Sequence, residues 1–314
     1  MTLVVPGTSK QINDKRLGYL YQAVRMGSVR AAADQLNVAP SAVSRQISLL
    51  EQELAVTLME RHRSGVTATD AGDVLLKYYR QSLSSEEACL ASLQALQGLH
   101  RGHIELAVGE GFVGDLMSGP LPQFNRKFPD ITLSISMGGS NEVIRKVEAD
   151  EAHIGLLFHP SSHPRIRSQA ISRRPICVVV CPSHPLAQRQ QAVSLEELLA
   201  YPVGLPESSF GVRQLLAMAE FQQRIRFQPA LTTNSIAVLK HFARSGMGFT
   251  FLPEFVVAAE VADQQLVAVP IDHELLARGE AHMVTRLGRQ LAAGPHQLLQ
   301  HLTFWMKAFK SPDK

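Results

Sequence analysis

Hydrophobic residues near the start of the chain recur with the spacing of short helices. The first stripe has the spacing i, i+3, i+4 and i+7 and consists of Leu17, Leu20, Tyr21 and Val24. Gly27 ends this predicted helix, and Ser28 is typical of the N-cap of an alanine-rich second helix. Pro40 suits the first turn of a third helix, where its missing N–H has no intrahelical acceptor. In this third helix the polar residues project away from an apolar stripe that consists of Val43, Ile47, Leu50 and Leu54.

The helical pattern resumes as one long segment, from residue 70 to about residue 97. Its apolar members are Val74, Leu75, Tyr78, Leu83, Leu90, Leu93 and Leu96. The small helical head that precedes this segment cannot bury so long a stripe, and no partner element follows directly. The pattern therefore favours pairing with the same helix of a second subunit, with an internal packing helix as the alternative.

From residue 104 onward short apolar strands alternate with helical stretches, which is typical of parallel α/β sheets. We place the linker at residues 98–103, where two glycines flank a basic patch. Strands are predicted at 103–108, 131–137, 152–158, 176–181, 231–233 and 248–252, and helices at 116–128, 141–149, 194–199 and 235–245. Ligands of open α/β sheets bind beyond the carboxyl ends of the strands, so the cleft between two such lobes is the expected ligand site.

The composition is that of a folded chain. The 314 residues are 45% hydrophobic and 19% charged, which predicts two or three globular domains. A net charge of +3 is too small to indicate a nucleic-acid binder by itself. Cys89, Cys177 and Cys181 are odd in number and lie in apolar surroundings, which argues against a disulfide framework. No apolar run reaches the length of a membrane helix, and residues 1–10 lack a signal-peptide core, so we expect a cytoplasmic protein that does not enter a membrane.

Common catalytic and metal-binding motifs are absent from the sequence. No G-x-S-x-G nucleophile motif, G-x-x-x-x-G-K phosphate loop or H-E-x-x-H zinc motif occurs. Cys177 and Cys181 lack the paired spacing of a zinc site, and we interpret them as buried apolar residues, with redox sensing as the alternative. His159, His163 and His184 lie among prolines and are interpreted as turn residues. We therefore expect neither an enzyme, nor a bound metal, nor a cofactor.

The third predicted helix presents hydroxyl groups and one arginine on its polar faces: Ser41, Ser44, Arg45 and Ser48. Such a face behind two compact helices is what a helix-turn-helix inserts into the major groove of DNA. The segments SVRAAADQLNV, SAVSRQISLLEQEL and the threonine-rich stretch at 67–72 strongly resemble the winged helix-turn-helix head of LysR-type transcriptional regulators. The resemblance runs unbroken over residues 17–72.

This resemblance implies which residues contact DNA. Those at or beside the major groove would be Ser41, Ala42, Ser44 and Arg45. Those that contact phosphates at the groove edges would be Arg30, Arg61 and Arg63, with residues 61–66 as the wing. Ala39 and Pro40 stand where the family usually has a polar pair, so some of the usual base readout is not expected there. For Arg45, an ordinary surface charge is the alternative.

The second half resembles, more weakly, the effector domain of the same family, which is itself similar to periplasmic solute-binding proteins. The resemblance covers about residues 104–306 and rests on FNRKFPDITLSI, ADEAHIGLLF, CPSHPLA and HFARSGMGFTFLPE. It implies an effector pocket formed by the turns that follow the strands. The candidate effector-binding residues are Glu110, Phe112, Ser140, Asn141, Glu207, Ser208, Asn234 and Ser235.

The chemistry of these candidates suggests a class of effector. Ser140 and Ser235 stand at predicted helix starts, where a hydroxyl and free N–H groups bind a carboxylate, although ordinary N-capping is the alternative. Glu110 is unusual for the family, which commonly has a small or polar residue there, and a carboxylate near the cleft favours a cation. Our hypothesis is an amine-like or amino-acid-like effector, bound by Glu110 at one end and by helix N-termini at the other.

The expected fold is α/β with an N-terminal winged helix-turn-helix at 1–72, a linker and dimerisation helix at 73–102, and a two-lobed effector domain at 103–314. Lobe I is expected at about 103–160 and 266–306, and lobe II at about 161–265. The predicted function is that of a transcriptional regulator controlled by a small molecule bound between the lobes. Its expected partners are double-stranded promoter DNA, RNA polymerase and further copies of itself, as a homodimer or homotetramer.

Two other classes of function compete with this one. A solute-binding or transport protein with a helical extension would need an export signal, and it leaves the recognition-helix pattern without a purpose. An enzyme on the same α/β scaffold would need a nucleophile, a base or a metal set in the cleft, and the sequence supplies none of these. The recognition-helix pattern, the lack of an export signal and the lack of a catalytic set therefore all favour the transcriptional regulator.

Overall fold

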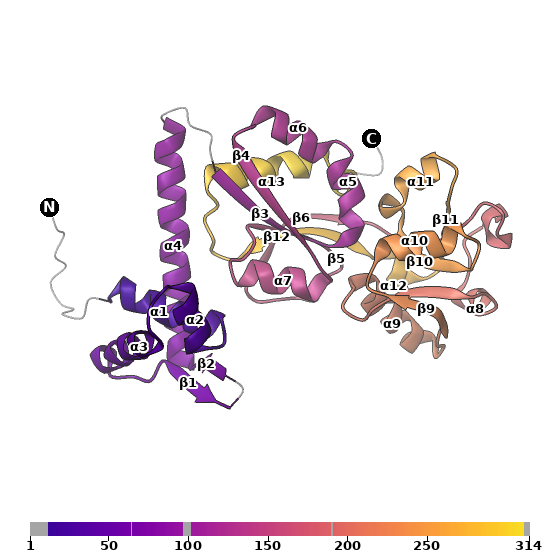
Figure 1. Cartoon of the computed structure of the whole chain (residues 1–314). Coiled ribbons are helices and arrows are strands. Elements are labelled where there is room, and N and C mark those ends of the chain that lie inside the picture. Colours follow the sequence, from indigo (N-terminus) through magenta and orange to yellow (C-terminus); the bar gives the residue numbers. More distant parts are fainter. Residues whose placement is uncertain (1–11, 64, 97–101, 190, 311–314) are drawn as a thin grey trace. The chain divides into compact units, whose positions relative to one another are not determined.

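A computed structural model describes residues 12–63, 65–96, 102–189 and 191–310 of the chain (Figure 1). The chain divides between Glu87 and Ala88 into two compact units. Among the described residues, the first unit is helical apart from a small hairpin, and the second contains two five-stranded sheets. Among all the residues that the structure describes, no helix is long and apolar enough to cross a membrane.

The N-terminal unit has the helices and the hairpin that the sequence predicts. Its elements are α1 (Asp14–Arg25), α2 (Val29–Gln35), α3 (Pro40–Leu54), β1 (Met59–His62), β2 (Gly65–Ala68) and the part of α4 (Asp70–Leu96) up to Glu87. Ser28 caps α2, since its Oγ accepts a hydrogen bond from the backbone N of Ala31 at 3.3 Å. The predicted stripes form the core in which α1, α2 and α3 pack together, with buried Leu17, Leu20, Val43, Ile47 and Leu50.

The first sheet of the C-terminal unit has the strand order β4-β3-β5-β12-β6. Its strands are β3 (Gly102–Val108), β4 (Ile131–Met137), β5 (Ile154–Phe158), β6 (Ile166–Arg173) and β12 (Glu280–Arg286). β3 is parallel to β4 and β5, whereas β12 is antiparallel to β5 and β6. The helices of this lobe are α5 (Val113–Met117), α6 (Pro120–Lys127), α7 (Ser140–Glu148) and α13 (Ala293–Trp305). α6 and α13 cover one face of the sheet and α7 covers the other (Figure 1).

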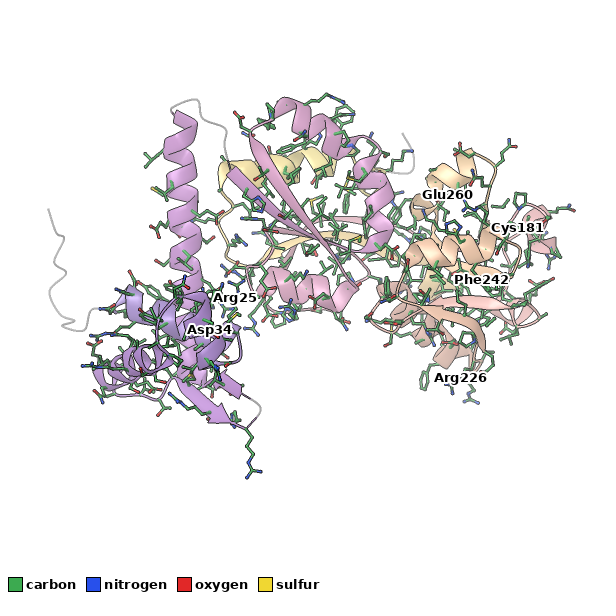
Figure 2. All side chains as sticks on the ribbon, in the orientation of Figure 1. Arg25, Asp34, Cys181, Arg226, Phe242 and Glu260 are labelled. Carbon is green, nitrogen blue, oxygen red and sulfur yellow. The ribbon has the colours of Figure 1, made fainter. Side chains whose placement is uncertain are left out.

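The second sheet has the order β11-β7-β10-β8-β9. Its strands are β7 (Ile176–Val180), β8 (Val203–Pro206), β9 (Pro229–Thr233), β10 (Phe249–Pro253) and β11 (Val267–Pro270). β8 is parallel to β9 and β10, and β7 is antiparallel to β10 and β11. The helices are α8 (Leu195–Leu198), α9 (Gly211–Gln223), α10 (Ile236–Arg244), α11 (Ala258–Ala262) and α12 (Glu274–Ala277). Side chains fill the space between the sheets and their helices (Figure 2), and one hydrophobic core continues through both lobes.

The structure places two strands in a different lobe from the one that the sequence suggests. β6 falls in the range expected for lobe II but pairs with β12 in the first sheet, and β11 falls in the range expected for lobe I but pairs with β7 in the second. The expected lobe limits are wrong at these segments. Both are edge strands, and β6 is separated from β5 by β12, which comes from a distant part of the chain. A local hydrophobic pattern does not specify which sheet edge a strand joins.

The helix predicted at 116–128 is divided into α5 and α6. Gly119 has φ −174° and ψ −50°, and Pro120 is the first residue of α6. Proline starts a helix readily but cannot continue one, because it lacks the N–H and its ring clashes with the preceding turn. The other strands and helices predicted in this half are confirmed, with ends shifted by at most two residues.

Candidate DNA interface and effector cleft

The two sides of α3 differ in exposure as a recognition helix requires. Val43, Ile47 and Leu50 are at most 1% exposed. Ser41 and Arg45 are exposed, and Ala42 and Ser44 are half-buried. The four residues predicted to contact the groove therefore lie off the buried face of α3.

The β1–β2 hairpin is attached to α3 and to the turn before α2. Nη2 of Arg61 on β1 donates a hydrogen bond to Oγ of Ser44 on α3 at 3.1 Å. The backbone N of Val66 on β2 donates to the carbonyl O of Gly27 at 3.0 Å. Gly65 has φ +135°, and a Cβ at this position would approach that same carbonyl O to 2.3 Å, so only glycine fits. The structure thus brings together Arg61 and Ser44, which the sequence predicts to contact DNA.

The other two predicted phosphate contacts are exposed. Arg30 lies on α2, and Arg63 lies in the turn of the hairpin. Three exposed arginines on different elements of one small unit favour contact with a polyanion such as the DNA backbone.

A cavity of about 440 Å³ lies between the two lobes, where β3, β4, β8 and β9 end. It is lined by Glu110, Met137, Gly138, Gly139, Glu142, Glu207, Ser209, Phe210, Asn234 and Ser235. Of the eight predicted effector-binding residues, Glu110, Glu207, Asn234 and Ser235 line it. Asn141 and Ser208 are exposed outside this lining. Phe210 ends the loop at 206–210 that the resemblance implies as part of the pocket, and Glu142, which was not predicted, directly follows the candidate Asn141.

Two predicted effector residues have structural contacts instead. Ser140 is 5% exposed; its Oγ donates to the carbonyl O of Phe158 and its backbone N to the carbonyl O of Ser209, both at 3.0 Å. Phe112 is 2% exposed, and its ring lies 5.1 Å from that of Phe255. In this structure Ser140 therefore has no free hydroxyl proton or N–H group with which to bind a carboxylate.

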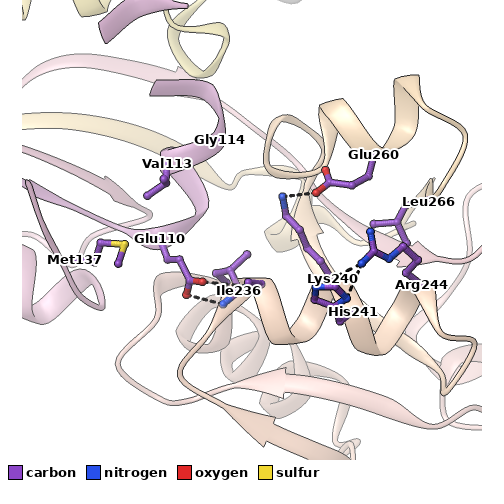
Figure 3. Close-up of a pocket in the computed structure, with 11 residues that line it drawn as sticks. Glu110, Val113, Gly114, Met137, Ile236, Lys240, His241, Arg244, Glu260 and Leu266 are labelled. Atoms are coloured by element: carbon purple, nitrogen blue, oxygen red, sulfur yellow. Dashed lines mark hydrogen bonds and ion pairs between the residues drawn. The ribbon is translucent and has the colours of Figure 1, made fainter. Parts of the chain in front are cut away.

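Glu110 binds the N-terminus of α10 across the cleft (Figure 3). Its Oε1 accepts hydrogen bonds from Oγ of Ser235 and the backbone N of Ala237, both at 3.0 Å. Its Oε2 accepts from the backbone N of Ile236 at 2.6 Å. The two groups that were expected to hold opposite ends of an effector therefore hold each other in this structure. Glu110 and Ser235 are 125 positions apart in the sequence, which explains why the sequence did not reveal this contact.

A second cavity, of about 310 Å³, is lined by Glu110 and by residues along α10 (Figure 3). Its charged lining includes Lys240, Arg244 and Glu260. Nζ of Lys240 lies 2.9 Å from Oε1 of Glu260, and Nη2 of Arg244 lies 2.6 Å from Nδ1 of His241. Lys240 is thus ion-paired with Glu260, and Arg244 is hydrogen-bonded to His241.

Burial and ion pairing shift several side-chain pKa values in this unit. Arg145 donates two hydrogen bonds to Glu142 and lowers the pKa of its carboxyl group. Burial raises the pKa of Cys177 to about 11, which keeps this thiol protonated and unreactive at neutral pH. Among the described residues, no group of three or more His, Cys, Asp or Glu side chains is arranged to hold a metal ion.

Two family models match the chain. The model described as the LysR substrate binding domain matches residues 97–306, and the one described as a bacterial regulatory helix-turn-helix protein of the lysR family matches residues 15–73. Together they cover both units of the structure.

Curated relatives and solved structures agree with these matches. The chain is 26% identical over 279 residues to the RuBisCO operon transcriptional regulator of Allochromatium vinosum, covering 87% of this chain and 90% of that protein. It is 29% identical over 245 residues to the nitrogen assimilation regulatory protein nac of Escherichia coli, covering 77% and 79%. A full-length OxyR variant from Pseudomonas aeruginosa has the same fold, with a TM-score of 0.69 at 17% identity over 95% of this chain and 100% of that one. These curated relatives are transcriptional regulators, not enzymes, and the chain belongs to the LysR family: it is a DNA-binding transcriptional regulator with an effector-binding domain.

Proposed function

We propose that this regulator recognises promoter DNA through α3 and the β1–β2 hairpin. The observation that carries the proposal is the 3.1 Å hydrogen bond from Arg61 to Ser44, which holds the hairpin against a helix whose opposite face is buried. The groove contacts are then made by Ser41, Ala42, Ser44 and Arg45. The phosphate contacts are made by Arg30, Arg61 and Arg63.

The cleft between the lobes favours a positively charged effector. Its described lining includes Glu110, Glu142 and Glu207, and no Lys, Arg or His. Arg145 pairs with Glu142 and α10 binds Glu110, whereas Glu207 is exposed on the wall of the cavity. We therefore assign the ammonium contact to Glu207 in place of Glu110, and keep an amine-like or amino-acid-like molecule as the effector class.

The apolar surface of α4 supports assembly into a homodimer, which can pair further into the homotetramer that the family resemblance implies. Two copies joined through this helix present two α3 helices to a pseudo-palindromic site in double-stranded promoter DNA. If two arrangements of the subunits bind the effector unequally, the effector favours one arrangement over the other. This shift changes the contact with RNA polymerase. Since promoter and polymerase are cytoplasmic, the protein acts there.

Selection of bound genomic DNA fragments by the purified full-length protein tests the DNA interface. We expect enrichment of a pseudo-palindromic promoter site, and a loss of about 1–3 kcal/mol with relaxed specificity for Arg45→Ala, because base contacts carry discrimination. For Arg63→Ala we expect uniformly weaker binding and a slope of log affinity against log salt that is smaller by about one.

The matched control is Arg126→Ala, which removes one exposed charge from α6 in the other unit and should leave both affinity and salt slope unchanged. Two results would contradict the proposal. One is the absence of any enriched sequence for the unmodified protein. The other is an Arg45→Ala protein that selects the same site with the same affinity.

A further inference from the structure

The first four N–H groups of an α-helix have no acceptor within the helix, and in α10 those of Ile236, Ala237 and Val238 are satisfied by side chains. Those of Ile236 and Ala237 donate to Glu110, and that of Val238 donates to Oγ of Ser235 at 3.4 Å. Ser235 in turn donates its hydroxyl proton to Glu110. A helix N-terminus binds the carboxylate of a ligand with this set of donors, because the helix dipole and free N–H groups attract an anion.

The carboxylate in this position comes from the other lobe. Glu110 follows β3 in lobe I, and α10 belongs to lobe II. The contact therefore ties the lobes together across the cleft. A second tie is the hydrogen bond from the backbone N of Ser140 in lobe I to the carbonyl O of Ser209 in lobe II at 3.0 Å.

There is space for a small molecule beside this contact. Glu110 lines both the 440 Å³ cavity and the 310 Å³ cavity, so its side chain forms part of the wall between them. Glu110 itself is only half-buried. Rotation of this side chain away from α10 would expose the N–H groups of Ile236 and Ala237 to a ligand in either cavity.

We propose that Glu110 is a built-in ligand, which fills a carboxylate site at the N-terminus of α10 and so holds the two lobes closed without an effector. An effector that carries a carboxylate has to displace Glu110, whereas an amine bound at Glu207 does not. The inference deepens the proposed function, since it concerns the same cleft. Its test uses neither DNA nor an amine, so either proposal can fail without the other.

Hydrogen exchange of single backbone amides in the full-length protein tests the proposal. In Glu110→Ala we expect the amides of Ile236 and Ala237 to exchange about tenfold faster or more, because each loses a hydrogen bond to a charged acceptor. The amide of Ser140 should also exchange faster, since the lobes part. Added acetate should protect Ile236 and Ala237 again in a saturable way, but not Ser140, because free acetate is not attached to lobe I.

Asp130→Ala is the matched control, since it removes one exposed carboxylate from lobe I away from α10 and should change none of these rates. Acetate should also leave the unmodified protein unchanged, and chloride at equal ionic strength should not replace acetate in Glu110→Ala. Unchanged exchange at Ile236 and Ala237 in Glu110→Ala would overturn the proposal. Failure of acetate to protect them would disprove the carboxylate site, and unchanged exchange at Ser140 would disprove the closing role.

Discussion

At the scale of the residue, His159 shows how distant contacts change the chemistry of a side chain. It follows β5 with a left-handed backbone at φ +45°, and its backbone N donates to the carbonyl O of Glu280 at 2.7 Å. Its Nδ1 is buried without a hydrogen-bond partner among the described residues. Burial lowers the pKa of His159 and the nearby His282 lowers it further, whereas Glu280 acts in the opposite direction. The interpretation of His159 as a simple turn residue therefore omits the buried Nδ1 of its half-buried ring.

This environment predicts a loss of stability in mild acid. The pKa of His159 is lower in the folded protein than the unfolded value of about 6.5, so the unfolded chain binds the proton more readily and stability falls as the pH drops below that value. His159→Asn removes this contribution, and asparagine tolerates the left-handed backbone. Thermal unfolding at about pH 7.5 and about pH 5.5 should show a smaller loss for the variant. An equal loss in both proteins would contradict the prediction.

At the scale of the element, α4 has more apolar surface than its own unit covers. Its exposed apolar side chains are Val74, Tyr78, Leu83, Leu90 and Leu93, which are 40% to 70% exposed. The same helix begins on the N-terminal unit, where Leu76 is buried in the core. Exposed apolar surface of this extent on one helix is typical of a protein–protein contact.

We expect Leu90→Glu to weaken self-association about tenfold or more, because it places a charge in an apolar contact between two α4 helices. Sedimentation equilibrium over a range of protein concentrations measures this. The control is Lys77→Glu, which puts a glutamate at an exposed position of α4 about 140° around the helix from Leu90 and at least about 60° from every exposed apolar residue named above. If the Leu90→Glu variant shows the same average molar mass in solution as the unmodified protein at every concentration, α4 does not form the subunit contact.

At the scale of the whole molecule, the position of the cleft depends on close approach between the lobes. Gly211, the first residue of α9, lies so near the end of β5 that a Cβ there would meet the carbonyl O of Phe158 at 1.8 Å. Gly139 likewise has room for no side chain, since a Cβ would lie 2.7 Å from the carbonyl O of Ser209. These contacts bring together the strand ends that line the larger cavity, and with them the carboxylates that give the cleft its negative charge.

This charge predicts which effectors bind. Calorimetry with a panel of primary amines, amino acids and carboxylic acids should identify an amine, and Glu207→Gln should weaken its binding about tenfold or more, since a charged hydrogen bond is lost. Glu142→Gln is the control, because Arg145 already pairs with that carboxylate and lowers its pKa. Unchanged amine binding in Glu207→Gln, or binding of carboxylic acids alone, would exclude the cationic effector.

The candidate residues of the DNA-binding unit were easier to predict than those of the cleft. Ser44 and Arg61 are 17 residues apart and belong to neighbouring elements, so a short motif places both. Glu110 and Ser235 were each predicted as effector-binding residues, but their contact depends on how two lobes close. Ser140 has the sequence position of a helix start, yet packing of lobe II against it buries the hydroxyl.

The sequence by itself determined the helices of the first unit, the length of α4 and most strands of the second unit, because each depends on periodicity within a short window. The pairing of β6 with β12 and of β11 with β7 was decided only by the tertiary structure. The same holds for the buried Nδ1 of His159 and for the contact of Glu110 with α10. The physical reason is that each joins segments far apart in the chain, and local polarity does not encode which distant partner a strand edge or a carboxylate meets.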